Sequence, residues 1–305
     1  MDYRKIINDR QFKDVTGHSK ADFLALLSDF EATFFSQHGQ SYEAYIEENV
    51  TEPPKLKTLG DALFFVLFQM KNDLLWGSLA FVFGIARSTA HDNFKHFSTL
   101  LEATLTQKGV MPKRAFENVE EFEEHLSEAK ELLFDGTENS TERPKGDDNQ
   151  RSKYSGKKHT HTDIALILSN KDTYIYYVSK LYEGSNVDFG IFKKEFPPDE
   201  GWFKNFKVVV DLGFVGIGKL YEIKELVIGV KRSRKSKKNP NPKLSEEQKE
   251  HNKAVSKERI FVEHAIGKLK RFRMLKNRSR LKSNELKDRI IGICAGLWNY
   301  CLTFR

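Results

Sequence analysis

The sequence predicts a chain in two parts, an all-helical N-terminal half followed by a mixed α/β half. Three observations support this prediction. Apolar residues recur at helical spacing up to about residue 105, short apolar runs typical of strands begin at Glu131, and the net charge changes sign between the two halves. With 305 residues, the chain is long enough for two or three domains and a sizeable core.

In the first half, apolar residues from Phe23 to Phe34 predict two short helices before residue 50. Pro53 and Pro54 end the first helical region, because paired prolines cannot continue a helix. A second helical block is expected over 59–105. The acidic stretch 117–128 predicts a connector helix that is polar on most of its faces.

The second half alternates strand-like runs with helical segments. Strands are predicted at 132–134, 164–168, 173–178, 208–210 and 226–230, and helices near 187–196, 245–272 and 285–302. The polar segments 144–159 and 231–243 predict loops. We therefore expect an N-terminal helical region over 1–54, a DNA-binding domain over 55–116, a connector over 117–130 and a catalytic domain over 131–305.

The net charge of +7 is unevenly distributed. Residues 1–127 hold 13 Lys/Arg and 19 Asp/Glu, whereas residues 231–282 hold 19 basic and 5 acidic side chains. A basic excess in one segment indicates a polyanionic partner such as nucleic acid, although a solvated lysine-rich surface has the same composition.

Targeting and redox features favour a cytoplasmic protein. No apolar run approaches the roughly 20 residues that a membrane span requires, and the N-terminus lacks a signal-peptide core. The two cysteines, Cys294 and Cys301, form neither a disulfide framework nor a zinc-binding pattern.

The segment from Leu75 to His91 predicts a helix-turn-helix. Ala80 is small where two helices cross closely, and Gly84 is able to take the positive φ of a tight turn. Polar side chains in the first turns of the second helix could then reach DNA: Arg87, Ser88, Thr89 and His91. A plain helical hairpin with a glycine turn fits the same pattern.

Asp135 and Asp211 each follow a short apolar run, so both are expected at the C-terminal end of a strand, projecting from a sheet edge. An aspartate that begins an ordinary turn has the same pattern. Glu263 is more distinctive, because on a helix it shares one face with Arg259 and Lys270, beside an apolar arc. A simple i,i+4 ion pair between Arg259 and Glu263 is the alternative.

Phosphodiester chemistry gives these three acids a reason to converge. Mg²⁺ prefers hard oxygen ligands, and two ions about 3.5–4 Å apart activate an attacking hydroxyl and stabilise the leaving oxygen. Arg259 and Lys270 could hold DNA phosphates beside such a site. The histidine pair His159 and His161 lies outside any cysteine-rich context and offers no competing metal site.

Four motifs resemble the DDE transposases of the bacterial insertion sequence 5 family, which are related to Harbinger elements. They are Phe134-Asp135-Gly136-Thr137-Glu138, Tyr154-Ser155-Gly156-Lys157-Lys158-His159, the stretch 210–216 around Asp211, and the stretch 258–270 around Glu263. With the segment 59–101, the resemblance covers roughly residues 59–305. One departure is Ser256, which stands where the family has a tyrosine.

The resemblance implies an RNase H-like catalytic domain in which Asp135 ends the first strand, Asp211 ends the fourth, and Glu263 lies on the following helix. It implies a catalytic and metal-binding trio of Asp135, Asp211 and Glu263 with two Mg²⁺ ions, which Mn²⁺ could replace. Expected DNA contacts also include Lys157, Lys158, Lys231, Arg232, Arg234, Arg259, Lys270 and Arg271.

The function expected from this resemblance is a DNA transposase. It would cut and join terminal inverted repeats and target DNA as a homodimer or higher multimer, associated with the nucleoid. Two alternatives remain open at this point: a metal-dependent endonuclease that cuts without joining, and a helix-turn-helix regulator that retains a nuclease-like domain.

Overall fold

A computed structural model describes residues 1–237 and 240–304. The chain forms two compact units. Unit one comprises Met1–Met111 and Lys268–Arg305, and unit two comprises Pro112–Gly267. The last predicted helix thus belongs to the same compact unit as the N-terminal residues.

Unit one is helical, as the apolar periodicity of its first hundred residues predicts. Its elements are η1 (Tyr3–Lys5), α1 (Asp9–Thr16), α2 (Lys20–His38), α3 (Tyr42–Asn49), α4 (Leu59–Asn72), α5 (Trp76–Phe83), α6 (Arg87–Gln107), α12 (Arg273–Lys276) and α13 (Asn284–Thr303). Helix α4 is apolar on nearly every side and lies in the centre of the core. Capping boxes at Ser19–Asp22 and Thr58–Asp61 begin α2 and α4.

The segment predicted as a helix-turn-helix forms α5 and α6, joined by a turn. Gly84 ends α5 with φ +66°, the positive value expected from the sequence. Ala80 is 5% exposed, consistent with a close helix crossing. The backbone thus forms a helix pair with a glycine turn.

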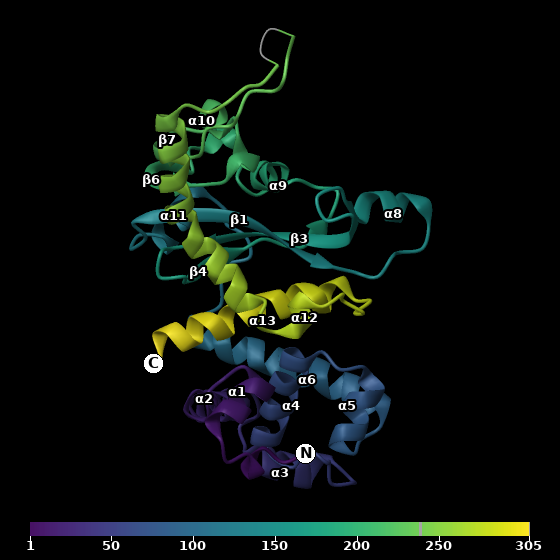
Figure 1. The fold of residues 1–305 in the computed structure, drawn as a ribbon. Helices are drawn as coiled ribbons and strands as arrows, with labels where there is room; N and C mark the ends of the chain where they lie inside the picture. Colours follow the sequence, from purple (N-terminus) through teal and green to yellow (C-terminus); the bar gives the residue numbers. More distant parts are fainter. Residues whose placement is uncertain (238–239, 305) are drawn as a thin grey trace. The chain divides into compact units, whose positions relative to one another are not determined.

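Unit two is built on a mixed sheet (Figure 1). Its strands are β1 (Glu131–Ser140), β2 (Tyr154–Ser155), β3 (Thr160–Ser169), β4 (Ile175–Val178), β5 (Tyr182–Glu183), β6 (Phe203–Val209) and β7 (Ile223–Val227). The main path runs β2-β3-β1-β6-β7, and β4 and β5 also pair with β3. Strand β1 is antiparallel to β3 and parallel to β6, which is parallel to β7. The predicted mixed α/β class is confirmed.

Helices cover the sheet of unit two. They are α7 (Val119–His125), α8 (Asp147–Lys153), α9 (Asp188–Glu195), α10 (Ile217–Leu220) and α11 (Glu246–Leu269), with η2 (Pro198–Glu200) and η3 (Leu212–Phe214) between them. None of the described helices combines the length and the apolar composition that crossing a lipid bilayer requires.

Alternating side chains of β1 pack on opposite faces of the sheet. Leu132 and Phe134 join an aromatic core that includes Phe192 of α9 and Phe122 of α7. Leu133 packs on the other face, against Val209 and against Val262 of α11. This alternation decides which face each polar residue of β1 takes.

The acidic stretch 117–128 forms the predicted helix as α7, and only Phe122 and Leu126 of that stretch are buried, in the aromatic core. Two local predictions were wrong. The segment 144–159 is not a loop throughout, because it contains α8 and β2. Asp135 does not end its strand: β1 continues to Ser140, since it stays paired with β3 as far as Ser140↔Thr162.

Candidate active site

Asp135 and Asp211 come together through the parallel pairing of β1 and β6. The pairing ends at Leu133↔Val209, and each aspartate lies two residues beyond that pair. Side chains two residues apart on an extended backbone point to the same face, and parallel neighbours lie about 4.8 Å apart. Both carboxylates are therefore expected on the face that α11 covers, where the two strands cease to be paired.

Arg259 connects Asp135 with Glu263. Its Nη2 lies 3.6 Å from Asp135 Oδ2 and 3.5 Å from Glu263 Oε1. The Asp135 side chain is 15% exposed, whereas that of Glu263 is 56% exposed. The predicted border position of Glu263 follows from its neighbours on α11, since Val262 and Ala265 are fully buried. Three of the sequence-predicted residues thus form one cluster.

Asp211 is held at the start of η3. Its Oδ1 accepts a hydrogen bond of 2.7 Å from the Gly213 amide. A Cβ at position 213 would lie 2.8 Å from the same oxygen, so this close approach requires glycine. The carboxylate of Asp211 is therefore fixed by the backbone that follows it.

A fourth carboxylate, Asp188, approaches from the opposite face of the sheet. It is the first residue of α9, and its side chain packs so closely on Gly136 that a Cβ there would overlap its carboxylate oxygen. The sequence analysis missed this residue, because an acidic residue in the first turn of a helix is common. Gly136, directly after Asp135, was the clue in the sequence, because a glycine lets another side chain approach the backbone closely.

Burial and neighbouring charges shift the pKa values of Asp135 and Asp188. Burial raises the pKa of Asp135 to about 6, against the lowering effect of Arg259, and the charges of Asp188 and Asp211 raise it further. Burial also raises the pKa of Asp188, which Lys157 lowers and Asp211 and Glu138 raise. Crowded carboxylates of this kind are destabilised unless a cation neutralises them.

The donor atoms are of the type that a divalent cation prefers, although the four carboxylates are not gathered within 4.8 Å of one another in this structure. The cluster offers carboxylate oxygens, the hard ligands that Mg²⁺ and Mn²⁺ prefer, from β1, α9, α11 and the end of β6. Asp135 Oδ1 also accepts a hydrogen bond of 2.9 Å from the Gly136 amide, which limits the rotation of this carboxylate. We therefore regard Asp135, Asp188, Asp211 and Glu263, termed here the carboxylate cluster, as the candidate active site.

The remaining predicted residues lie in several places. Lys157 and Lys158 are exposed between β2 and β3, and Lys157 is near enough to Asp188 to lower its pKa. Lys231, Arg232 and Arg234 are exposed after β7, and Arg87, Ser88, Thr89 and His91 are exposed in the first turns of α6.

Two predicted DNA contacts, Lys270 and Arg271, lie after α11. Helix α11 ends at Leu269, so Lys270 lies beyond the helical face that Arg259 and Glu263 share. Arg271 packs over the rings of Phe272 and Trp298, with its guanidinium carbon 5.0 Å and 5.6 Å from the two centroids. Both residues belong to unit one.

Comparisons with known proteins identify similar sequences. Residues 134–299 match the family model described as DDE superfamily endonuclease. A protein described as a probable transposase for insertion sequence element IS702, from Microchaete diplosiphon, is 33% identical over 177 residues. That region is 57% of this chain and 58% of the relative, so the chain spans little more than half of the relative's length. No solved structure shows significant similarity.

The family model spans more than half of the sequence and includes all four members of the carboxylate cluster. The chain therefore belongs to the DDE superfamily endonuclease family.

Proposed function

We propose that the chain is a DNA transposase that cuts and joins DNA at transposon ends, with an RNase H-like catalytic domain in unit two. The proposal rests on Asp188 and Asp211 lying near enough to Asp135 for their charges to act on it, and on Arg259, which links Asp135 with Glu263, in a chain of this endonuclease family. With the two-residue strands β2 and β5 left aside, Asp211 follows the fourth strand of the sheet, as such a domain requires.

Asp135, Asp211 and Glu263 would hold two Mg²⁺ ions, with Mn²⁺ as a possible replacement. Bound there, the ions would supply Lewis-acid activation of an attacking water or 3′-hydroxyl and would stabilise the leaving oxygen. The chain's own contribution is to fix its oxygens in place: the Gly136 amide orients Asp135, and the Gly213 amide orients Asp211. Asp188 would complete the negative charge that faces the ions.

Arg259 would position the acids and meet the substrate. In the protein alone its guanidinium lies between Asp135 and Glu263, within 3.6 Å of both. Divalent ions on those carboxylates would compete with it, and its fork of donors would then be able to bind a DNA phosphate. Lys157 is a second candidate for phosphate binding, because its charge already acts on Asp188.

The substrate would be double-stranded DNA, both the terminal inverted repeats and the target. The exposed cations of the β7–α11 loop would bind phosphates, and the first turns of α6 would read the groove through Arg87, Ser88, Thr89 and His91. Because two ends must be brought together, a homodimer or higher multimer is expected on DNA, associated with the nucleoid.

The decisive assay supplies a pre-cut DNA end and measures its covalent joining to a target duplex in Mg²⁺ and in Mn²⁺. We expect joined product from the wild-type chain and none from Asp135→Asn, Asp211→Asn or Glu263→Gln, each with DNA binding retained. Cutting without joining would instead identify a metal-dependent endonuclease. DNA binding with no Asp211-dependent uptake of Mg²⁺ or Mn²⁺ by calorimetry would identify a regulator.

A further inference from the structure

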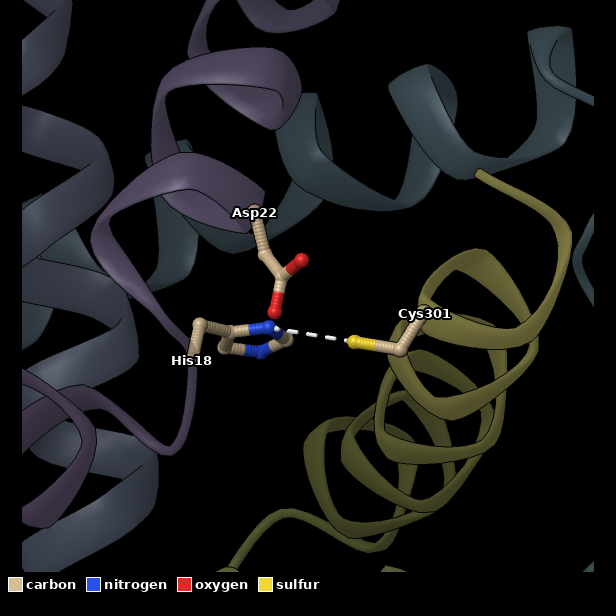
Figure 2. Close-up of side chains that lie close together, drawn as sticks. All are labelled: His18, Asp22 and Cys301. Carbon is tan, nitrogen blue, oxygen red and sulfur yellow. Dashed lines mark hydrogen bonds between the residues drawn. The ribbon is translucent and has the colours of Figure 1, made fainter. Parts of the chain in front are cut away.

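We propose that His18, Asp22 and Cys301 form a separate binding site in unit one for one zinc-class transition-metal ion. One ligating atom from each residue lies within 4.8 Å of the others. Figure 2 shows the Asp22 carboxylate and the Cys301 sulfur directed toward the imidazole of His18, and the His18 Nδ1 and Cys301 Sγ atoms are 3.4 Å apart.

The dimensions of this group suit one ion. Zinc binds sulfur at about 2.3 Å and nitrogen or oxygen at about 2.0–2.2 Å, so its ligand atoms lie roughly 3–4 Å from one another. The His18–Cys301 separation of 3.4 Å is already in that range. The 4.8 Å bound on the set requires at most a small side-chain rotation at Asp22.

His18 is held in place by the backbone before it. The Thr16 hydroxyl accepts from the His18 amide at 3.1 Å and donates to Phe12 O at 2.8 Å. Gly17 has φ +83°, which turns the chain out of α1 so that His18 follows the helix end. The imidazole, 1% exposed, lies 6.0 Å from the Phe272 ring. Such support lowers the entropy lost when a ligand binds a metal.

The other two ligands are also preorganised. Asp22 accepts a hydrogen bond of 3.3 Å from the Ser19 amide as part of the capping box of α2. Cys301 lies in α13, is 2% exposed, and has the Arg271 guanidinium 3.9 Å from its sulfur. A neighbouring cation favours the thiolate, which is the form that binds metals.

The chemistry of the set selects the class of ion. Imidazole, thiolate and carboxylate together suit Zn²⁺ and its tetrahedral analogue Co²⁺, whereas Mg²⁺ prefers oxygen ligands alone. Three protein ligands leave a fourth position for water. The near-complete burial of Cys301 and His18 disfavours the alternative of a Cys–His nucleophile, because a substrate could not reach the sulfur.

The expected effect of the ion is structural. It would join the start of α2 to the end of α13 across 283 residues of sequence, both within unit one. A metal that closes a long loop restricts the unfolded chain and so stabilises the folded unit. The site is independent of the carboxylate cluster, so neither result depends on the other.

The test uses the full chain, freed of metal and titrated with Co²⁺ alone while absorbance is recorded. We expect a thiolate-to-cobalt charge-transfer band in the near ultraviolet whose intensity corresponds to one thiolate-bound Co²⁺ per chain, and loss of that band when Zn²⁺ is added. Cys301→Ser should abolish the band. Cys294→Ser is the matched control, because Cys294 is also fully buried on α13 and should leave the band unchanged.

A second variant distinguishes loss of metal binding from misfolding. Asp22→Asn keeps an oxygen for the capping box while removing the charge, and should weaken Co²⁺ binding at least tenfold with an unchanged circular dichroism spectrum. Zn²⁺ should raise the thermal midpoint of the wild-type chain but not that of Cys301→Ser. No charge-transfer band in the wild-type chain, or a band that persists in Cys301→Ser, overturns the proposal.

Discussion

At the scale of single residues, the surroundings of Asp135 explain why its ionised form is destabilised and why a cation would be favoured beside it. The carboxylate is largely removed from water and faces two other aspartates, so its ionised form is disfavoured despite Arg259. A protein that retains such a group without a cation gives up stability at neutral pH. The same crowding would be relieved by a divalent cation at this position.

The first prediction concerns the metal-free stability of Asp135→Asn. Because the folded pKa is about 6 and the unfolded value is 3.8, the wild-type aspartate favours folding at low pH, and that contribution is lost as pH rises from about 4 through 6. In the presence of chelator, the variant should therefore be more stable than wild type at pH 8, by up to about 3 kcal/mol. The two should agree near pH 4.

Urea unfolding at several pH values measures this difference. Asp199→Asn is the control, because Asp199 is exposed in η2 and should show no pH-dependent gain. A variant at position 135 that is less stable than wild type at pH 8 would contradict the assigned environment.

The second prediction tests the contact between Asp188 and Gly136. Gly136→Ala places a Cβ where the Asp188 carboxylate lies, so the carboxylate must move. We expect roughly 10–100-fold weaker Mn²⁺ binding and a comparable loss of DNA joining, the range typical of disturbed metal-site support. Asp188→Asn should give a similar loss.

Gly156→Ala is the matched control, because nothing lies within 4 Å of a Cβ at that position. Calorimetry with Mn²⁺ and the joining assay provide the two measurements. If Gly136→Ala behaves like Gly156→Ala, then Asp188 has no part in the site.

At the scale of elements, helix α11 holds the residues that directly precede the exposed basic loop between β7 and α11. Asn252 of α11 accepts from the Val230 amide at 2.7 Å and donates to Val230 O at 3.0 Å. His251 Nε2 lies 2.9 Å from Ile228 O. The helix that carries Glu263 thus also holds the start of the exposed loop, of which residues 238 and 239 are outside the described part of the chain.

The third prediction follows from this anchoring. Replacing Lys231, Arg232 and Arg234 together by glutamine should weaken DNA binding for all sequences alike. It should also reduce the slope of log affinity against log salt by about two to three, because each lost phosphate contact removes about 0.9. Fluorescence anisotropy over a series of salt concentrations gives both values.

Three exposed cations of unit one, Arg10, Lys55 and Lys57, provide a control with the same change in net charge. Their replacement by glutamine should change the slope less. An unchanged slope in the loop variant would place the loop off the DNA path.

At the scale of the whole molecule, unit one is assembled from both ends of the chain. Helix α13 contributes a long series of buried residues, and Asn299 donates to Val110 O at 2.9 Å within that unit. The family model nevertheless continues to residue 299, so sequence similarity and compact packing assign this helix differently.

The fourth prediction is that a chain truncated after residue 283 loses the structure of unit one selectively. Removal of α13 exposes the apolar face of α6, including Leu101 and Leu105, which are fully buried in the whole chain. Amide hydrogen exchange should show reduced protection over residues 1–111 and retained protection in β1, β3 and β6. Equal loss in both units, or none in either, would contradict the division into two units.

Much of the C-terminal half could be predicted, because apolar runs and helical periodicity are patterns of residues that are close in the sequence. The apolar runs before Asp135 and Asp211 predicted β1 and β6, and the periodicity around Glu263 predicted the buried face of α11. The end of β1 was misplaced, since pairing with β3 continues through polar residues that have no strand-like pattern. The burial of Phe122 in α7 was missed because one aromatic residue in an acidic stretch carries little weight.

By itself, the sequence determined the element types, the opposite charges of the two halves and the three acids that its motifs single out. Only the tertiary structure decided which residues meet. Parallel pairing of β1 with β6 places Asp135 and Asp211 two residues beyond the same strand pair, close packing on Gly136 brings Asp188 near, and the return of α13 brings Cys301 to His18. The physical reason is that spacing along the chain predicts local conformation, whereas contacts between distant residues depend on strand register and core packing.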